Sequence, residues 1–301
     1  MSTFFLLFLP VIVPILGGFG VFIIRFQNRT ARQIYVGAVV IVNMILSLVA
    51  IFVAPKGQTV TLIPFTENYS IALRLDGMAV FFGFILCTLW VVATFYSFEY
   101  MKHEGKENKF FGFYTMSFGI AMGLAFSANL LTFYLFYELL TLGTLPLVMH
   151  AMNPQAQYAG KKYIVYSIGG AAFAFIAMVF MMYYGTSLDF TFGGVLDMLQ
   201  VAGHEQWLLV VFVLAFFGFG VKAAVFPLSG WLPSAGVAPT PVTALLHAVA
   251  VVNAGVYALV RLIYYTFGTE FLSGSWAQYV VMSAALVTIV YGSSMALRTP
   301  H

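Results

Sequence analysis

Residues 207–261 read WLLVVFVLAFFGFGVKAAVFPLSGWLPSAGVAPTPVTALLHAVAVVNAGVYALVR, and they combine features that a membrane-spanning helix normally avoids. Lys222 follows fifteen almost wholly apolar residues, although a lysine at the centre of a spanning helix costs about 2.5 to 3.5 kcal/mol. Pro227, Pro233 and Pro239 then interrupt the segment too often for an unbroken helix. Irregular backbone at bilayer depth survives only inside protein or beside a wet cavity. The stretch therefore predicts a broken, charged helix, which typically marks an ion or substrate path.

The remainder of the chain is equally apolar. Of its 301 residues, 62% are hydrophobic and 8% are charged, and the mean hydropathy is +0.97. This composition excludes a soluble domain and predicts a polytopic membrane protein. Apolar runs of the length of a spanning α-helix recur, and the alternating segments typical of membrane barrels are absent. The expected fold class is therefore all-α, and the net charge of +3 gives no indication of a nucleic-acid partner.

Nine transmembrane helices can be placed along the chain, of which the seventh is the broken one. Their expected bounds are 3–24, 33–54, 76–98, 110–127, 129–150, 162–184, 207–229, 240–265 and 276–297. The first run is followed by Arg25 and not by a small-residue cleavage site. We therefore interpret it as a spanning helix and not as a signal peptide.

The basic residues divide unequally between alternate loops. One side carries Arg25, Arg29, Arg32, Lys102, Lys106, Lys109, Lys161, Lys162 and Arg298. The other side carries Lys56, Arg74 and, at a span end, Arg261. The positive-inside rule then predicts a multi-pass protein of the plasma or inner membrane, with its N-terminus outside and its C-terminus in the cytoplasm.

Glu138 lies near the middle of the apolar run LLTFYLFYELLTLGTLPL, and its own helix offers no Lys or Arg within one turn. One interpretation is a protonated glutamate that forms a hydrogen bond inside a helix bundle. The other is a pair across helices with Lys222, in which each side chain biases the protonation of its partner. The second arrangement would suit a proton pump.

His247 stands in the span after the proline-rich break. A single histidine among Ala and Val is as often a packing residue as a functional one. Beside a lysine path it could instead relay protons, since its ordinary pKa of about 6.5 is near neutral. Asn253, six residues later, cannot titrate.

Other charged residues lie at span ends, where a structural role is the simpler interpretation. Asp76 opens the third predicted span, and Glu99 and His103 lie near its end. The run from Gly169 to Phe175, GGAAFAF, predicts close helix contacts. The sequence contains no CxxC, HExxH, GxxxxGK[ST] or GxSxG motif, so we expect no metal, no cofactor and no catalytic site in this chain.

Four motifs in order carry a family resemblance: RLDGMAVFF at 74–82, YSFEYM at 96–101, FYELLTLGTLPL at 136–147, and the segment 221–261. Together they resemble the antiporter-like membrane subunits shared by respiratory complex I (NADH:quinone oxidoreductase), Mrp-type Na+/H+ antiporters and membrane-bound hydrogenases. The match covers nearly the whole chain.

The resemblance implies a fold of two inverted five-helix repeats, each with a broken helix. It would place three N-terminal helices in 1–109, the first repeat in 110–266, and the first helix of a second repeat in 267–301. Glu138 resembles the family's fifth-helix glutamate, Lys222 its broken-helix lysine and His247 an eighth-helix histidine. These three residues would form half of a hydrated proton channel.

The chain also departs from the family pattern. Ser229, Ser234 and Gly236 stand where many members carry titratable side chains, and Asn253 stands where related hydrogenase-type sequences carry a second lysine. The family continues to about fourteen helices, whereas this chain stops after the ninth. We therefore expect either a split or shortened subunit, or a fragment of a longer protein.

The leading hypothesis is a proton-translocating subunit of a multi-subunit redox-driven or Mrp-type complex, of the NADH:quinone oxidoreductase or hydrogenase kind. Sodium–proton exchange remains open. Its partners would be other membrane subunits and the lipid bilayer. One alternative is a structural half-subunit that does not conduct. Another is an independent transporter of a small solute, which would normally build its site between two repeats.

Overall fold

The computed structural model describes residues 2–298. By its internal contacts the chain divides into two units, which we describe separately. Unit 1 extends to Ile164 and also includes Ala235–Val251, and unit 2 comprises Val165–Ser234 and the chain from Val252 onward. The helix α6 (Pro154–Tyr184) begins in unit 1 and ends in unit 2.

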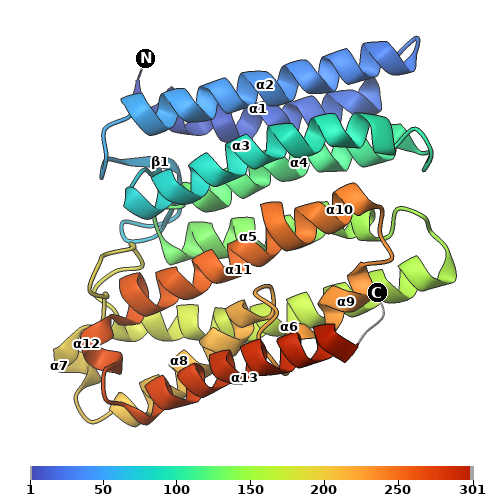
Figure 1. Ribbon diagram of the computed structural model, residues 1–301. Helices are drawn as coiled ribbons and strands as arrows, with labels where there is room; N and C mark the ends of the chain where they lie inside the picture. Colours follow the sequence, from blue (N-terminus) through green and yellow to red (C-terminus); the bar gives the residue numbers. More distant parts are fainter. Residues whose placement is uncertain (1, 299–301) are drawn as a thin grey trace. The chain divides into compact units, whose positions relative to one another are not determined.

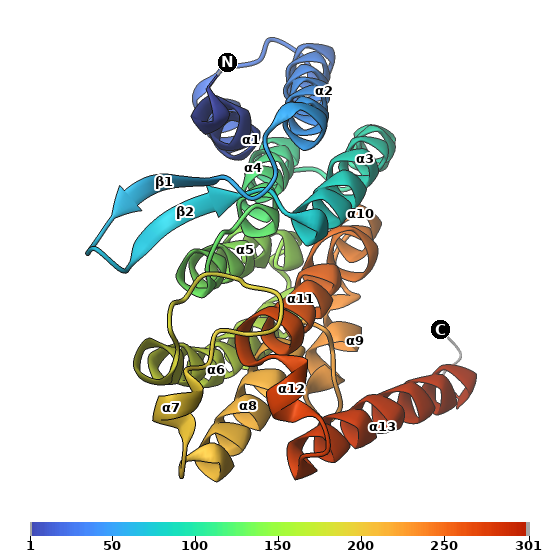
Figure 2. The same cartoon turned by 90° about the vertical axis from the view of Figure 1, so that its left-hand side faces the viewer.

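Unit 1 holds the N-terminal helices, a β-hairpin and a short helical segment from later in the sequence (Figures 1 and 2). Its elements, besides the start of α6, are α1 (Thr3–Ile23), α2 (Arg29–Val53), β1 (Thr59–Pro64), β2 (Ser70–Arg74), α3 (Gly77–Tyr100), α4 (Glu107–Ala125), α5 (Leu130–Val148), α10 (Thr240–Ala244) and the π-helix η2 (Leu245–Val249). Within this unit α4 packs against α1 and α5, and α2 packs against α1 and α3.

Unit 2 is built around the predicted broken helix. Its elements, besides the end of α6, are α7 (Met198–Val201), α8 (Glu205–Gly220), the 3₁₀-helix η1 (Leu228–Gly230), α9 (Trp231–Ala235), α11 (Val251–Val260), the π-helix η3 (Arg261–Phe267), α12 (Thr269–Leu272) and α13 (Trp276–Arg298). The last residue of α9 and the first residue of α11 belong to unit 1. Within this unit α13 packs against α8. The side chain of Trp276 reaches Gln206 with an indole N–H to oxygen distance of 2.9 Å.

The fold class predicted from the sequence is confirmed. Among the described residues, seven helical segments are long and apolar enough to cross a membrane, with Thr240–Phe267 counted as one. The other two predicted spans correspond to α4, of 19 residues, and to α8, a shorter apolar helix of 16 residues. The chain is an all-α, multi-pass membrane protein with a single two-stranded sheet in its described part. The prediction that the chain stops after the ninth helix falls on residues 299–301, which lie outside the described residues.

Polar side chains cap the N-terminal ends of several helices. The side chains of Asn28, Asp76 and Asn129 each accept the amide of the residue three positions later, which satisfies a free N–H group at a helix start. Asp76 is therefore a structural residue at a span end, as predicted. Asn153 caps α6 in the same way, and Pro154 is its first residue. This cap and proline explain why α6 begins before the predicted residue 162.

The long loop after α2 folds into the hairpin β1–β2, which is tied to the turn between α4 and α5. Ala128 donates its amide to the Ala72 carbonyl at 3.0 Å, and Arg74 donates its amide to the Phe126 carbonyl at 2.7 Å. The hydroxyl of Thr132 accepts the Ala72 amide at 2.9 Å. Figure 2 shows the hairpin turn pointing away from the helices of unit 1.

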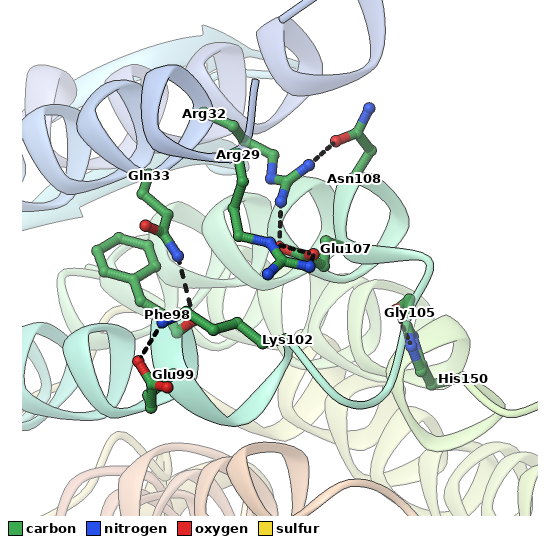
Figure 3. A network of polar contacts seen from close by, with 10 residues as sticks. All are labelled: Arg29, Arg32, Gln33, Phe98, Glu99, Lys102, Gly105, Glu107, Asn108 and His150. Atoms are coloured by element: carbon green, nitrogen blue, oxygen red, sulfur yellow. Dashed lines mark hydrogen bonds and ion pairs between the residues drawn. The ribbon is translucent and has the colours of Figure 1, made fainter. Parts of the chain in front are cut away.

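Glu107 ties two helices together at the end of unit 1 that carries most of its basic residues (Figure 3). Its carboxylate accepts a hydrogen bond from Arg29 at 2.8 Å and forms an ion pair with Arg32. Arg32 also donates to Asn108 at 2.9 Å. Since Glu107 is the first residue of α4, its negative charge also interacts favourably with the helix dipole. We call this end of unit 1, which carries Arg29, Arg32 and Glu107, the basic end.

We expect Glu107→Gln to lower the free energy of unfolding by about 1 to 3 kcal/mol, because it removes the carboxylate beside a guanidinium that is largely buried. The Arg32 side chain is only 12% exposed. Thermal or denaturant unfolding of the purified protein in detergent would measure the change. Glu99→Gln is the matched control, since Glu99 forms an exposed pair with Lys102 and its loss should change stability little. Equal effects of the two substitutions would contradict the role of Glu107.

His150 joins the end of α5 to the loop before α4 at the same basic end. Its Nε2 donates to the Gly105 carbonyl at 3.1 Å (Figure 3), so the neutral ring carries its proton on Nε2. Its Nδ1 is buried and has no hydrogen-bond partner among residues 2–298. Burial lowers the pKa of His150, and the bond to Gly105 acts in the opposite direction.

Stability should therefore fall on acidification through the pKa of His150. Between the lowered folded pKa and the ordinary value near 6.5, the unfolded chain binds more protons than the folded chain, so unfolding becomes easier as the pH falls. Thermal unfolding measured across this range should lose part of its pH dependence in His150→Gln. His103→Gln, at an exposed position, should retain the full dependence, and an unchanged slope in His150→Gln would refute the assignment.

Candidate functional site

The predicted break in the seventh span is present. Helix α8 ends at Gly220, and Lys222 lies in the turn that follows. Three backbone groups near the break are satisfied by protein atoms. The Val221 carbonyl accepts the indole N–H of Trp231 at 2.7 Å, the Gly220 carbonyl accepts the Val225 amide at 2.9 Å, and the Thr288 hydroxyl of α13 accepts the Phe226 amide at 2.9 Å.

The three predicted helix-breaking prolines occupy different places after this turn. Pro227 directly precedes the 3₁₀-helix η1. Pro233 lies inside the short helix α9, and Pro239 is the residue before α10. The prolines therefore divide the segment into short helical pieces, because each lacks the amide needed to continue a helix.

Glycines bring the backbones of three helices close together beside Lys222. A Cβ added at Gly170 of α6 would lie 2.5 Å from the Gly218 carbonyl of α8, and one added at Gly218 would lie 2.6 Å from the Gly170 carbonyl. A Cβ at Gly255 of α11 would lie 2.2 Å from the Ala223 amide and 2.6 Å from the carbonyl carbon of Lys222. The predicted close contact in the Gly169–Phe175 run is confirmed at Gly170, whereas the partners Gly218 and Gly255 were not predicted.

The three candidate proton-path residues lie in different surroundings. Lys222, in unit 2, is fully buried. Glu138, in unit 1, lies on α5, and its Oε1 atom is buried. His247, also in unit 1, lies exposed on the π-helix η2, where its Nδ1 donates to the Thr243 carbonyl at 2.9 Å. The pairing of Glu138 with Lys222 stays a prediction.

Two π-helical segments lie in the span after the break, and the sequence did not predict them. The first, η2, contains His247, and the second, η3, begins at Arg261. Single π-turns occur often at functional sites, because they rotate a side chain out of the regular helical pattern. The hydrophobic periodicity of a short apolar segment does not reveal such a turn.

Arg261 is buried, with 1% of its surface exposed, although it was expected simply as a charge at a span end. Its Nε and Nη2 atoms donate to the Tyr257 hydroxyl at 3.1 and 2.6 Å. Its guanidinium carbon lies 4.8 Å from the ring centre of Phe190, 5.0 Å from that of Tyr257 and 4.6 Å from that of Tyr265. Such stacking stabilises a guanidinium away from water.

Comparison with known proteins identifies the family. The model of the NADH:quinone oxidoreductase/Mrp antiporter transmembrane family matches residues 127–300, which include Glu138, the break and both π-helices. The chain belongs to this family. The resemblance inferred from the four sequence motifs is thus confirmed.

The curated relatives of this antiporter-family chain are much longer than the chain itself. A Na(+)/H(+) antiporter subunit of Alkalihalophilus pseudofirmus is 28% identical over 287 residues, which are 92% of this chain and 34% of that protein. A putative antiporter subunit, mnhA2, of Staphylococcus aureus is 28% identical over 290 residues, 92% of this chain and 35% of that protein. The chain thus spans about a third of the length of these relatives.

Two solved structures share the fold. The membrane-bound sulfane sulfur reductase, an archaeal respiratory membrane complex, matches with a TM-score of 0.71 and 20% identity, over 88% of this chain and 54% of that one. The Mrp complex from Dietzia sp. DQ12-45-1b matches with a TM-score of 0.70 and 24% identity, over 85% and 28%.

The close approach of α6 and α8 can be tested at two adjacent glycines. We expect Gly170→Ala to destabilise the protein by about 1 to 3 kcal/mol, because the added methyl group overpacks the crossing next to the break. Gly169→Ala is the matched control, since its Cβ would meet no atom within 4 Å, and alanine favours a helix over glycine by up to about 1 kcal/mol. Unfolding in detergent would compare the variants, and a Gly170→Ala protein as stable as Gly169→Ala would contradict this packing.

Proposed function

We propose that this chain is a proton-translocating membrane subunit of a multi-subunit complex. The observation that carries the proposal is the burial of Lys222 at a helix break whose backbone is satisfied by protein groups. An ammonium group is costly at bilayer depth, and a lysine that loses its solvation exchanges its proton more readily than an arginine does. A buried lysine at such a break is therefore suited to bind and release a proton during transport.

Glu138 and His247 are the proposed partners of Lys222 in this path. A carboxylate near a buried ammonium stabilises the charged form of both groups. Protonation of Glu138 removes its negative charge and would therefore favour proton loss from Lys222. His247 would pass protons on, since an imidazole gains and loses a proton near neutral pH. In this proposal residues 110–266 form the first antiporter-like repeat, and 267–301 begin a second one.

The membrane orientation and the partners follow from charge and family. Most of the helix ends of α1 to α6 that carry Lys and Arg lie at the basic end of unit 1. Their charge favours a cytoplasmic location for this end in a plasma or inner membrane, with the N-terminus outside. The relatives are antiporter subunits and the matched structures are membrane complexes. We therefore propose other membrane subunits as partners, with protons or sodium–proton exchange as the transported species.

One observation favours a second candidate, a structural subunit that does not conduct. Asn253 lies on α11 two residues from Gly255, which contacts the backbone of Lys222. An asparagine cannot titrate at this place, so a proton leaving Lys222 would need water or another side chain. If the path ends there, the chain would contribute packing to a complex and no transport.

Proton transport by the assembled complex in inverted membrane vesicles separates these two candidates. We expect Lys222→Ala and Glu138→Gln to reduce the transport rate by about tenfold or more, as removal of a proton-transfer group typically does. Lys56→Ala, in an exposed loop, should transport at the original rate. Unchanged transport in Lys222→Ala, with the complex present in normal amounts, would establish the structural role instead.

A further inference from the structure

Ser167 is a buried serine on the part of α6 that belongs to unit 2. It is 2% exposed, and its hydroxyl has no hydrogen-bond partner among residues 2–298. A buried hydroxyl without a partner is costly, because folding removes it from water and supplies no hydrogen bond in exchange. An alanine would fill the same space without this cost, so the hydroxyl indicates a polar role.

Several other buried hydroxyl groups bond to the backbone of their own helix. Ser47, Thr94, Ser97 and Thr144 donate to the carbonyl four residues earlier, at 2.7, 2.7, 2.6 and 2.7 Å. This local bond satisfies the hydroxyl inside an apolar helix. Ser167 does not make the corresponding bond to Tyr163, so its hydroxyl remains available to a group outside its own helix.

The contacts between α6 and α8 show how these two helices are aligned near the break. A Cβ added at Gly218 would lie 2.9 Å from the Ala174 amide. A Cβ added at Gly170, four residues earlier on α6, would lie 2.6 Å from the side chain of Val221, three residues later than Gly218. The two helices therefore run in opposite directions here, and the preceding turn of α6 lies beside the residues that follow Val221.

Ser167 belongs to that preceding turn of α6. It lies three residues before Gly170, and residues at this spacing share one face of a helix. Both residues are buried, whereas Ile168 and Gly169 between them are exposed. The hydroxyl of Ser167 is thus placed at the level of the turn that contains Lys222.

The helices of unit 2 supply no other charged side chain at this level. Residues 165–184 of α6, residues 252–260 of α11 and the short helix α9 contain no Asp, Glu, Lys, Arg or His. Helix α8 contains only Glu205, at its first residue, and α13 contains only Arg298, at its last. Glu205 precedes Lys222 by seventeen residues, which is about 25 Å along a helix. Within unit 2, the groups that can bond to the lysine at this level are therefore neutral.

We infer that Ser167 is a positioning residue for Lys222, and that its hydroxyl forms a hydrogen bond with the lysine amino group in both protonation states. The inference rests on the proposed role of Lys222 in proton transport. An ammonium group only donates hydrogen bonds, whereas a neutral amine can also accept one. A hydroxyl can accept in the first state and donate in the second, so Ser167 keeps its own proton and remains a partner while Lys222 gains and loses one. A backbone carbonyl, which only accepts, cannot follow this change.

Proton transport by the assembled complex in inverted vesicles separates a hydrogen-bonding role of Ser167 from a packing role. We expect Ser167→Ala to reduce the transport rate by about tenfold, because a hydrogen bond to a charged group typically contributes at least this factor. Ser167→Thr, which retains a hydroxyl, should restore most of the rate. A residue that only packs would give the opposite order, since alanine fits the space of serine and threonine adds a methyl group to a tight helix crossing. That opposite order would overturn the inference.

The ¹⁵N resonance of the Lys222 amino group gives a second measurement, which needs no transport. The full chain, labelled with ¹⁵Nζ-lysine and reconstituted in lipid bilayers, is measured by solid-state NMR, and Lys222→Arg identifies the resonance by its loss. We expect the resonance to shift in Ser167→Ala, because the amino group loses a hydrogen-bond partner. Ser47→Ala is the matched control, since Ser47 is equally buried but bonds to its own helix, and its loss should leave both the resonance and the transport rate in place. A Lys222 resonance that does not move in Ser167→Ala would overturn the contact.

The two measurements distinguish failure of this inference from failure of the proposed function. Loss of transport in Lys222→Ala together with full transport in Ser167→Ala would overturn the role of Ser167 alone. Unchanged transport in Lys222→Ala would overturn the proposed function, and a shifted resonance in Ser167→Ala would then show that the two side chains meet for a structural reason only.

Discussion

The backbone groups released where α8 ends must find partners inside the protein, because hydrocarbon offers none. The structure meets this requirement with side chains distant in sequence: the indole of Trp231 and the hydroxyl of Thr288 bond to the break. Glycines let α6 approach α8 at Gly218, and let α11 approach the turn at Lys222 and Ala223, at backbone distance. The irregular conformation around Lys222 therefore depends on this shell of contacts, and the buried lysine depends on the conformation.

Unit 2 contains two buried cationic side chains, Lys222 and Arg261, which differ in whether they can lose their charge. An ammonium group can lose its proton in a site of low polarity, so Lys222 is suited to a step in which charge changes. A guanidinium keeps its charge, and the rings and hydroxyl around Arg261 hold it in one orientation. Lys222 can therefore change its charge inside the protein, whereas Arg261 keeps its charge.

The charged residues at the basic end of unit 1 have a different, structural role. Glu107 joins α2 to α4 through two arginines, and His150 joins α5 to the loop before α4. These contacts hold the helix ends together where water would compete for their polar groups. Arg29 and Arg32 are among the basic residues counted from the sequence on one side, and the predicted orientation depends on that count.

The sequence alone determined the all-helical membrane fold, the position of the break and the family, because hydropathy, prolines and motifs are local properties that can be read along the chain. It also identified Asp76 as a residue of a helix end and the Gly169–Phe175 run as a place of close helix contact. The tertiary structure decided which glycines meet, which side chains bond to the break, where π-turns occur and that Arg261 is enclosed by aromatic rings. These features require atoms from segments far apart in sequence to meet within a few ångströms, and residue order by itself does not specify that geometry.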